Sequence, residues 1–195
     1  PTGVGGPVEV SVQTGSETAF ASSFFSVLQR GKNVFEGAAS FTDGADGDVA
    51  WSDYDKDGDM DFVVSGNGDG PETTIYENEG NGNFTPLDAG FTGTFRSSVA
   101  WGDFNHNDLP DLAISGFTGS GPTTVIYRNL GGGDFQPVGA DIPGVGESDL
   151  AWADFDEDGD LDLAVTGETS DNVPTTRLYR NNGDGAFTQV GAGLI

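Results

Sequence analysis

The sequence predicts an all-β protein built from repeated units of four short antiparallel strands, and three observations lead to this prediction. A motif of aromatic and acidic residues occurs three times at intervals of about 50 residues, with its tryptophans at Trp51, Trp101 and Trp152. Segments rich in Val, Ile, Thr and aromatic residues alternate with turns of Gly, Asn and Asp. No segment shows a sustained helical period. Four strands in about 50 residues, repeated, are typical of the blades of a β-propeller.

The strands of each unit are predicted in a fixed order. The first strand surrounds the tryptophan and leads into an acidic loop, and the second is an apolar stretch that ends in Gly, at residues 62–66, 112–116 and 163–167. The third strand carries a Thr-Thr pair and a tyrosine, which is Tyr76, Tyr127 or Tyr179. A Gly- and Asn-rich turn, which supplies the left-handed backbone of a tight hairpin, precedes the fourth strand at Phe84, Phe135 or Phe187.

We expect residues 1–195 to form one β-propeller or a fragment of one, with blades at 46–95, 96–146 and 147–195 and a partial blade at 1–45. Within the partial blade, residues 8–15 resemble a second strand and residues 25–35 resemble the last hairpin of a unit. Its first strand and its acidic loop are missing. Open sheet edges would then pair with a second copy or with further blades. A compact four-bladed ring is the second-ranked alternative.

The composition narrows the classes of function. The chain has 32 acidic and 7 basic residues, for a net charge of −25. A field of that sign repels nucleic acids and anionic lipid surfaces. No apolar run approaches the ~18 residues of a membrane-spanning helix, so we expect no membrane insertion. The absence of cysteine excludes disulfides and thiolate metal sites as stabilisers.

The acidic loops have the pattern of a calcium site, because Ca²⁺ takes six to eight oxygen ligands from a sharply curved segment. Three nine-residue segments are named loop one (53–61), loop two (103–111) and loop three (154–162). Side chains at positions 1, 3, 5 and 9 and the backbone carbonyl at position 7 are the predicted ligands. In loop one these are Asp53, Asp55, Asp57, Asp61 and, at position 7, Asp59. In loop three they are Asp154, Asp156, Asp158, Asp162 and, at position 7, Asp160.

Loop two departs from this pattern. Its predicted ligands are Asp103, Asn105, Asn107, Asp111 and, at position 7, the carbonyl of Leu109. Only two of them are charged, and Asp108 replaces the glycine found at position 6 of the other loops. We therefore expect two strong Ca²⁺ sites and one weaker site at 103–111.

Two other interpretations of the loops are weaker. An EF-hand requires Glu at position 12, where loops one and three have Val64 and Val165. Asp is common in solvated turns, but three copies at one place of the repeat favour a metal site over such turns.

Residues 99–105 and 150–165 resemble the FG-GAP/VCBS repeats of integrin-α-like propellers. The resemblance is strong over residues 46–195 and weak over 7–45. It implies a β-propeller, usually of seven blades, with calcium in the loop between the first two strands of a blade and ligands at positions 1, 3, 5 and 9. Such repeats occur in extracellular adhesion proteins, in lectins and in secreted polysaccharide-degrading enzymes.

Catalysis is not expected. The chain has a single histidine, His106, at a non-ligand position of loop two, and its paired aspartates are already assigned as metal ligands. Tyr76, Tyr127 and Tyr179, followed by Glu77, Arg128 and Arg180, recur once per unit. They either pack between blades or form a ligand platform, and packing is the favoured interpretation.

The sequence thus predicts a non-catalytic, calcium-binding module of a secreted or cell-surface protein, with a glycan or an extracellular protein as its ligand. The alternative is a structural or accessory domain of a larger secreted polysaccharide-degrading enzyme or adhesin.

Overall fold

The computed structural model describes residues 11–14, 17–20, 45–183 and 185–191, and within these ranges every regular element is a β-strand. The predicted all-β class is therefore confirmed. None of the described residues belongs to a helix with the length and apolarity needed to cross a bilayer. The chain divides into two compact units, residues 1–37 and 38–195.

The first unit contains one hairpin. Strands β1 (Ser11–Thr14) and β2 (Glu17–Phe20) pair antiparallel, with Ser11 opposite Phe20 and Thr14 opposite Glu17. Strand β1 falls within residues 8–15, where a strand of the partial blade was predicted. The hairpin predicted at 25–35 lies outside the described residues.

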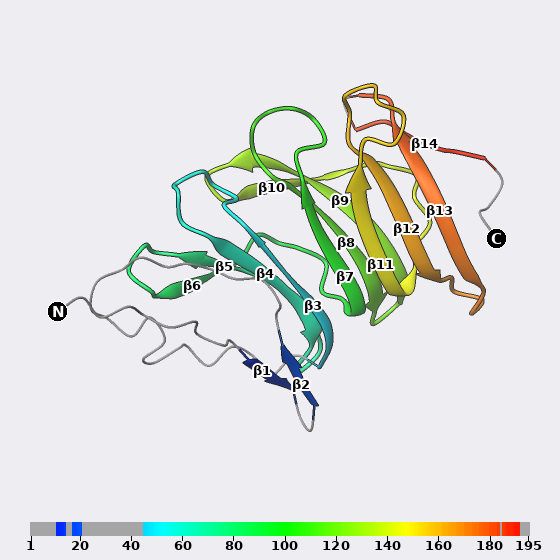
Figure 1. The fold of residues 1–195 in the computed structure, drawn as a ribbon. Coiled ribbons are helices and arrows are strands. Elements are labelled where there is room, and N and C mark those ends of the chain that lie inside the picture. The colour runs from blue at the N-terminus through cyan, green and yellow to red at the C-terminus, as the bar shows by residue number, and fades with distance from the viewer. Residues whose placement is uncertain (1–10, 15–16, 21–44, 184, 192–195) are drawn as a thin grey trace. The chain divides into compact units, whose positions relative to one another are not determined.

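The second unit consists of three four-stranded antiparallel sheets, each in chain order (Figure 1). The first sheet contains β3 (Ala45–Ser52), β4 (Asp61–Asn67), β5 (Pro71–Asn78) and β6 (Phe84–Leu87). The second contains β7 (Phe95–Gly102), β8 (Asp111–Thr118), β9 (Gly121–Gly131) and β10 (Asp134–Val138). The third contains β11 (Gly146–Ala153), β12 (Asp162–Glu168), β13 (Pro174–Asn181) and β14 (Phe187–Gln189). These sheets match the three predicted units of about 50 residues.

The register places equivalent residues of the repeat side by side in every sheet. In the second sheet, Trp101 lies opposite Leu112, and Leu112 lies opposite Tyr127 on the next strand. The first and third sheets have the same alignment of Trp, apolar residue and Tyr. Each tyrosine, predicted from its spacing alone, is buried.

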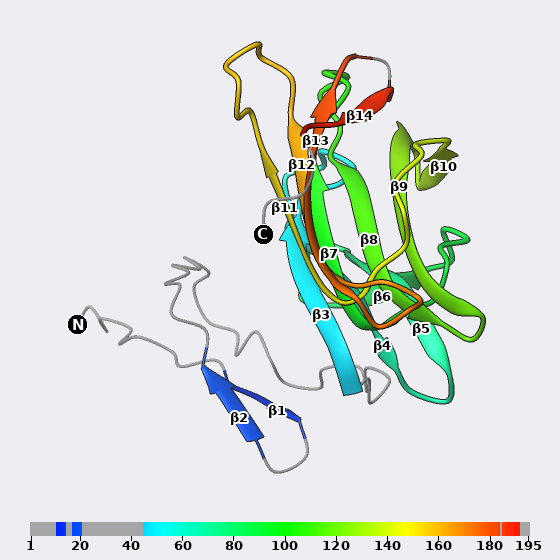
Figure 2. The same ribbon diagram turned by 90° about the vertical axis from the view of Figure 1, so that its right-hand side faces the viewer.

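The first strands of the sheets, β3, β7 and β11, lie next to one another, as Figures 1 and 2 show. The tryptophans make the same contact at both junctions. Trp101 Nε1 donates to the carbonyl of Ala50 at 3.2 Å, and Trp152 Nε1 donates to the carbonyl of Ala100 at 3.2 Å. Each sheet therefore packs on the one before it through a repeated hydrogen bond.

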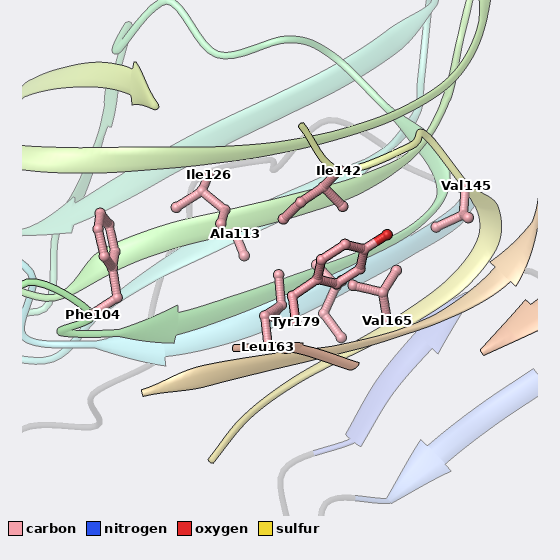
Figure 3. Close-up of a cluster of buried hydrophobic side chains, with 9 residues drawn as sticks. Phe104, Ala113, Ile126, Ile142, Val145, Leu163, Val165 and Tyr179 are labelled. Atoms are coloured by element: carbon pink, nitrogen blue, oxygen red, sulfur yellow. The ribbon is translucent and has the colours of Figure 1, made fainter. Parts of the chain in front are cut away.

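Buried apolar side chains fill the space between consecutive sheets. One cluster joins the first and second sheets and includes Tyr54, Ile75 and Leu112. The other joins the second and third sheets and includes Phe104 and Tyr179 (Figure 3). Packing between sheets accounts for Tyr127 and Tyr179, which belong to these clusters. Tyr76 stacks on Phe62 of its own sheet, with ring centroids 5.1 Å apart.

Candidate metal centre

Each acidic loop joins the first two strands of a sheet. Loops one, two and three follow β3, β7 and β11, and their position-9 aspartates are the first residues of β4, β8 and β12. Strand pairing on both sides fixes the two ends of each loop. The carboxylates between these ends therefore share a small volume.

Two left-handed residues curve each loop. Position 4 has a positive φ in all three loops, for example 64° at Lys56 and 56° at His106. Position 6 is also left-handed, with φ of 97° at Gly58 and 67° at Asp108. A glycine adopts this backbone without steric cost, whereas Asp108 carries a Cβ there. Loop two thus has the same backbone conformation as the other loops, although Asp108 is less suited than glycine to a positive φ.

The position-9 aspartates are buried and hold each loop to its own sheet. The exposed fractions of Asp61, Asp111 and Asp162 are 0, 0 and 1 %. One carboxylate oxygen accepts from the backbone N–H of position 2, at 3.1–3.2 Å in all three loops. The other accepts from the backbone N–H of an asparagine in the last residues of the third strand, at 2.8 Å in all three sheets.

Loop one brings three of its predicted ligands together. Carboxylate oxygens of Asp53, Asp55 and Asp61 all lie within 4.8 Å of one another. Burial raises the pKa of Asp61 to about 6 and also raises the pKa of Asp55. Asp57, at position 5, instead accepts from the backbone N–H of Asp59 at 2.8 Å. A cation would relieve the repulsion among the three converging carboxylates.

Loop three repeats the arrangement with Asp154, Asp156 and Asp162, whose carboxylate oxygens again lie within 4.8 Å of one another. Asp156 Oδ2 pairs with Arg180 Nε at 2.7 Å. Asp156 Oδ1 is buried and has no hydrogen-bond donor among the described residues. A buried carboxylate oxygen without a donor, beside two further carboxylates, fits the oxygen ligand set of a calcium ion.

Loop two has two carboxylates where loops one and three have three that converge, and both of them accept hydrogen bonds within the loop. Asn105 Nδ2 donates to Asp111 Oδ2 at 2.7 Å, where the other loops place a position-3 carboxylate. Both oxygens of Asp103 accept backbone N–H groups, from Asn107 at 3.1 Å and from Asp108 at 2.9 Å. Burial raises the pKa of Asp111 to about 6. The Asn105 amide therefore gives Asp111 a hydrogen-bond donor, where the other loops bring a further carboxylate close.

The remaining predicted ligands are at positions 5 and 7. Asp158 Oδ1 accepts from the backbone N–H of Asp160 at 2.9 Å, as Asp57 does in loop one. The Asp160 carboxylate pairs with His106 Nε2 at 3.0 Å, which links loops two and three. In loop two, Asn107 Nδ2 donates to a backbone carbonyl of the second sheet at 3.0 Å. Coordination by the carbonyls of Asp59, Leu109 and Asp160 stays a prediction.

The residue after each recurring tyrosine contacts the aromatic side chain at position 2 of the same loop. Tyr54 Oη donates to Glu77 Oε2 at 3.1 Å, and burial, reinforced by Glu77, raises the pKa of Tyr54. The Arg180 guanidinium lies over the Phe155 ring at 5.6 Å from its centroid, and Arg128 lies 5.9 Å from that of Phe104. The residue after each recurring tyrosine therefore packs against the acidic loop of its own sheet.

Three asparagines that contact the acidic loops were not predicted from the sequence: Asn78, Asn129 and Asn181. Asn78 and Asn181 end β5 and β13, and Asn129 lies two residues before the end of β9. Their backbone N–H groups make the 2.8 Å bonds to the position-9 aspartates. A signal for them exists in the sequence, because a Tyr-x-Asn motif recurs once per unit.

Comparison with known proteins agrees with this repeat structure. The family model for FG-GAP-like repeats matches residues 53–114 and 116–165, more than half of the chain and all of loops one, two and three. Neither the curated proteins nor the solved structures contain a match. FG-GAP repeats are often calcium-binding and are typical of extracellular proteins. From the matched repeats, the three equivalent sheets and their acidic loops, the chain belongs to the FG-GAP-like repeat family.

Proposed function

We propose that the chain is an extracellular module in which loops one and three bind Ca²⁺. The observation that carries this proposal is the convergence of three carboxylates within 4.8 Å at the same place in two repeats. A hard cation with oxygen ligands suits both clusters. Extracellular calcium would fill even sites with a dissociation constant of about 10⁻⁴ to 10⁻³ M.

The role of the ion in this proposal is structural. Asp53 and Asp55 lie in loop one, whereas Asp61 begins β4, so an ion bound by all three ties the loop to the sheet. It also offsets part of a net charge of −25, which opposes a compact state. Binding free energy of this kind adds directly to the free energy of unfolding.

We propose a propeller arrangement of the sheets. It is supported by the repetition of the same contacts from sheet to sheet. Besides the tryptophan bonds, Ser65 Oγ and Ser97 Oγ lie 2.8 Å apart between the first and second sheets, and Ser115 Oγ and Ser148 Oγ lie 2.7 Å apart between the next two. A junction that repeats with one geometry can be extended by further sheets of the same type.

The module is proposed to bind a glycan or an extracellular protein through an open surface and to have no catalysis of its own. A hollow lined by Arg180, Asn182 and Gln189 has a volume of about 170 Å³. This is smaller than the ~300 to 1,000 Å³ of an enclosed small-molecule site. His106 is paired with Asp160 of the neighbouring loop, which supports a structural role for the single histidine.

A second candidate is a structural or accessory domain of a larger adhesin or secreted polysaccharide-degrading enzyme. It is favoured by the exposure of aromatic side chains on the first and third sheets of the second unit. Trp51 is 48 % and Phe155 39 % exposed, whereas the equivalents of Phe155 in the other loops, Tyr54 and Phe104, are at most 2 % exposed because the next sheet covers them. Further blades or a partner could cover these aromatic groups in the same way.

Two experiments test the proposal. Chelation should lower the melting temperature of the chain, and Asp154→Ala should lower it more than Asp103→Ala, because loop two has only two charged ligands. Equal or absent effects would contradict the calcium assignment. A glycan array screened with calcium and with chelator tests the glycan ligand. Calcium-dependent binding to a coherent set of sugars supports a lectin-like module, and a blank array with a calcium-dependent fold favours a protein contact or the structural role.

A further inference from the structure

Asn129 and Asn181 are fully buried polar side chains between consecutive sheets, each with an exposed fraction of 0 %. A buried amide lowers stability unless its donors and acceptors are paired. Their partners therefore show what these side chains do.

Each amide joins two acidic loops. Asn129 Nδ2 donates to the carbonyl of Tyr54 in loop one at 2.8 Å and to the carbonyl of Pro110 in loop two at 3.0 Å. Asn181 Nδ2 makes the equivalent bonds one sheet later, to the carbonyl of Phe104 at 2.8 Å and to that of Leu161 at 3.3 Å.

The backbone groups of the same residues extend these bonds into a continuous chain. Tyr54 N–H donates to Asp61, and the Tyr54 carbonyl accepts from Asn129. The backbone N–H of Asn129 donates to Asp111 at 2.8 Å. The same two steps then run through Phe104 and Asn181 to Asp162. A chain of buried hydrogen bonds thus links the position-9 aspartates of all three loops.

We propose that Asn129 is a positioning residue for the metal site of loop one, although it lies in the next sheet and is not a ligand. This inference rests on the proposed calcium binding. The Tyr54 carbonyl belongs to the peptide group that precedes Asp55, so the Asn129 bond fixes the backbone of a position-3 ligand. The Tyr54 N–H fixes the position-9 ligand Asp61. Because the backbone at Asp55 and the carboxylate of Asp61 are already oriented before the ion binds, less conformational entropy is lost on binding.

The other two loops allow the effect of the Asn129 bond to be compared within the same chain. Asn181 makes the same bonds in the same buried setting, but to loop two instead of loop one. In loop three, the Phe155 carbonyl has no such amide donor among the described residues. In loop one an amide of the neighbouring sheet therefore holds the peptide group before the position-3 ligand, and in loop three no described amide does so. Calcium binding to loop one should be the tighter of the two.

The test uses the full chain with loops two and three disabled by Asp103→Ala and Asp154→Ala, so that calorimetry with Ca²⁺ reports loop one. Asn129→Ala should weaken this binding by roughly 10- to 100-fold, the usual effect of removing a group that orients a metal ligand. Asn181→Ala, the matched control, should change it less than about twofold, since its amide contacts loop two. Backbone hydrogen exchange in chelator should show faster exchange at Asp55 for Asn129→Ala only.

The outcomes separate the two proposals. No calcium binding by the unmodified chain would overturn the calcium function and this inference with it. Calcium binding that both asparagine variants weaken equally, or that neither weakens, would overturn the positioning role and leave the calcium function intact. If the alanine variants do not fold, Asn129→Leu and Asn181→Leu keep the side-chain volume, remove the same donors and are judged by the same comparison.

Discussion

Asn105 Nδ2 donates to Asp111 Oδ2 at 2.7 Å, so the buried carboxylate of loop two has a side-chain hydrogen-bond donor within its own loop. Loops one and three have an aspartate in place of Asn105, and their carboxylates converge instead. The residue type at position 3 therefore separates a loop in which an amide donates to the buried carboxylate from two loops in which three carboxylates converge.

Asn105→Asp should convert loop two into a calcium-dependent loop. In chelator the variant should melt at a lower temperature than the natural chain, because Asp111 loses a donor and gains a nearby negative charge. With calcium, affinity at loop two should rise by roughly tenfold or more, as the number of charged ligands increases. Asn81→Asp adds the same charge at an exposed turn and is the control. Calorimetry showing the same binding for both variants would contradict the prediction.

Arg180 should weaken calcium binding at loop three, because its guanidinium already pairs with Asp156 at 2.7 Å. The pair is partly exposed, so its contribution is about 0.2 to 1 kcal/mol. Arg180→Gln should therefore strengthen binding at loop three by roughly two- to fivefold. Arg177→Gln removes the same charge from the same strand without a described contact to the loop. If the two variants bind calcium equally, the change in affinity comes from net charge, and the ion pair between Arg180 and Asp156 does not affect binding.

Without calcium, the buried carboxyls of Asp61 and Asp111 should make the chain more stable in mild acid than at neutral pH. Burial raises the pKa of each from 3.8 to about 6. Between these values the folded chain holds protons that the unfolded chain releases, so this contribution to the free energy of unfolding falls as pH rises toward about 6. Melting in chelator should therefore occur at a higher temperature at about pH 5 than at about pH 7.

Removing one of these groups tests the cause of the pH dependence. Asp111→Asn should reduce the difference between the two melting temperatures, whereas Asp69→Asn, which removes an exposed charge, should leave it nearly unchanged. An equal slope in both variants would assign the effect to net charge instead of to the buried carboxyl.

The hydroxyls of Tyr127 and Tyr179 should contribute differently to stability. Tyr127 Oη accepts from the backbone N–H of Thr92 at 3.0 Å, whereas Tyr179 Oη is buried without a partner among the described residues. Pro143 stands at the equivalent place in the third unit and has no N–H to donate. Tyr127→Phe should cost about 1 kcal/mol, and Tyr179→Phe should be neutral or stabilising. Denaturant unfolding measures both, and a larger loss for Tyr179→Phe would contradict this explanation.

The period of the sequence was enough to predict the local structure. Tryptophan, apolar residue and tyrosine align across each sheet because strand pairing repeats with the sequence. The acidic loops could be placed as well, because each follows the tryptophan strand directly and its position-9 aspartate leads into the apolar second strand.

The contacts between units could not be predicted in the same way. Asn129 meets Tyr54 across 75 residues of sequence, and only the packing of one sheet on the next brings them together. The internal bond of Asn105 also escaped prediction, because an amide can serve as a metal ligand or as a donor and its neighbours decide which. Position 5 was predicted to join the ligand cluster, yet Asp57 is directed to its own loop backbone.

Calorimetric titration of the chelator-treated chain with Ca²⁺ tests the central claim most directly. We predict two ions bound at loops one and three, with weaker binding at loop two, and the loss of one tight ion in each of Asp53→Ala and Asp154→Ala. The melting temperature should rise with calcium concentration in parallel. A chain that gives no heat of binding, and that melts at the same temperature in calcium and in chelator, would contradict the account.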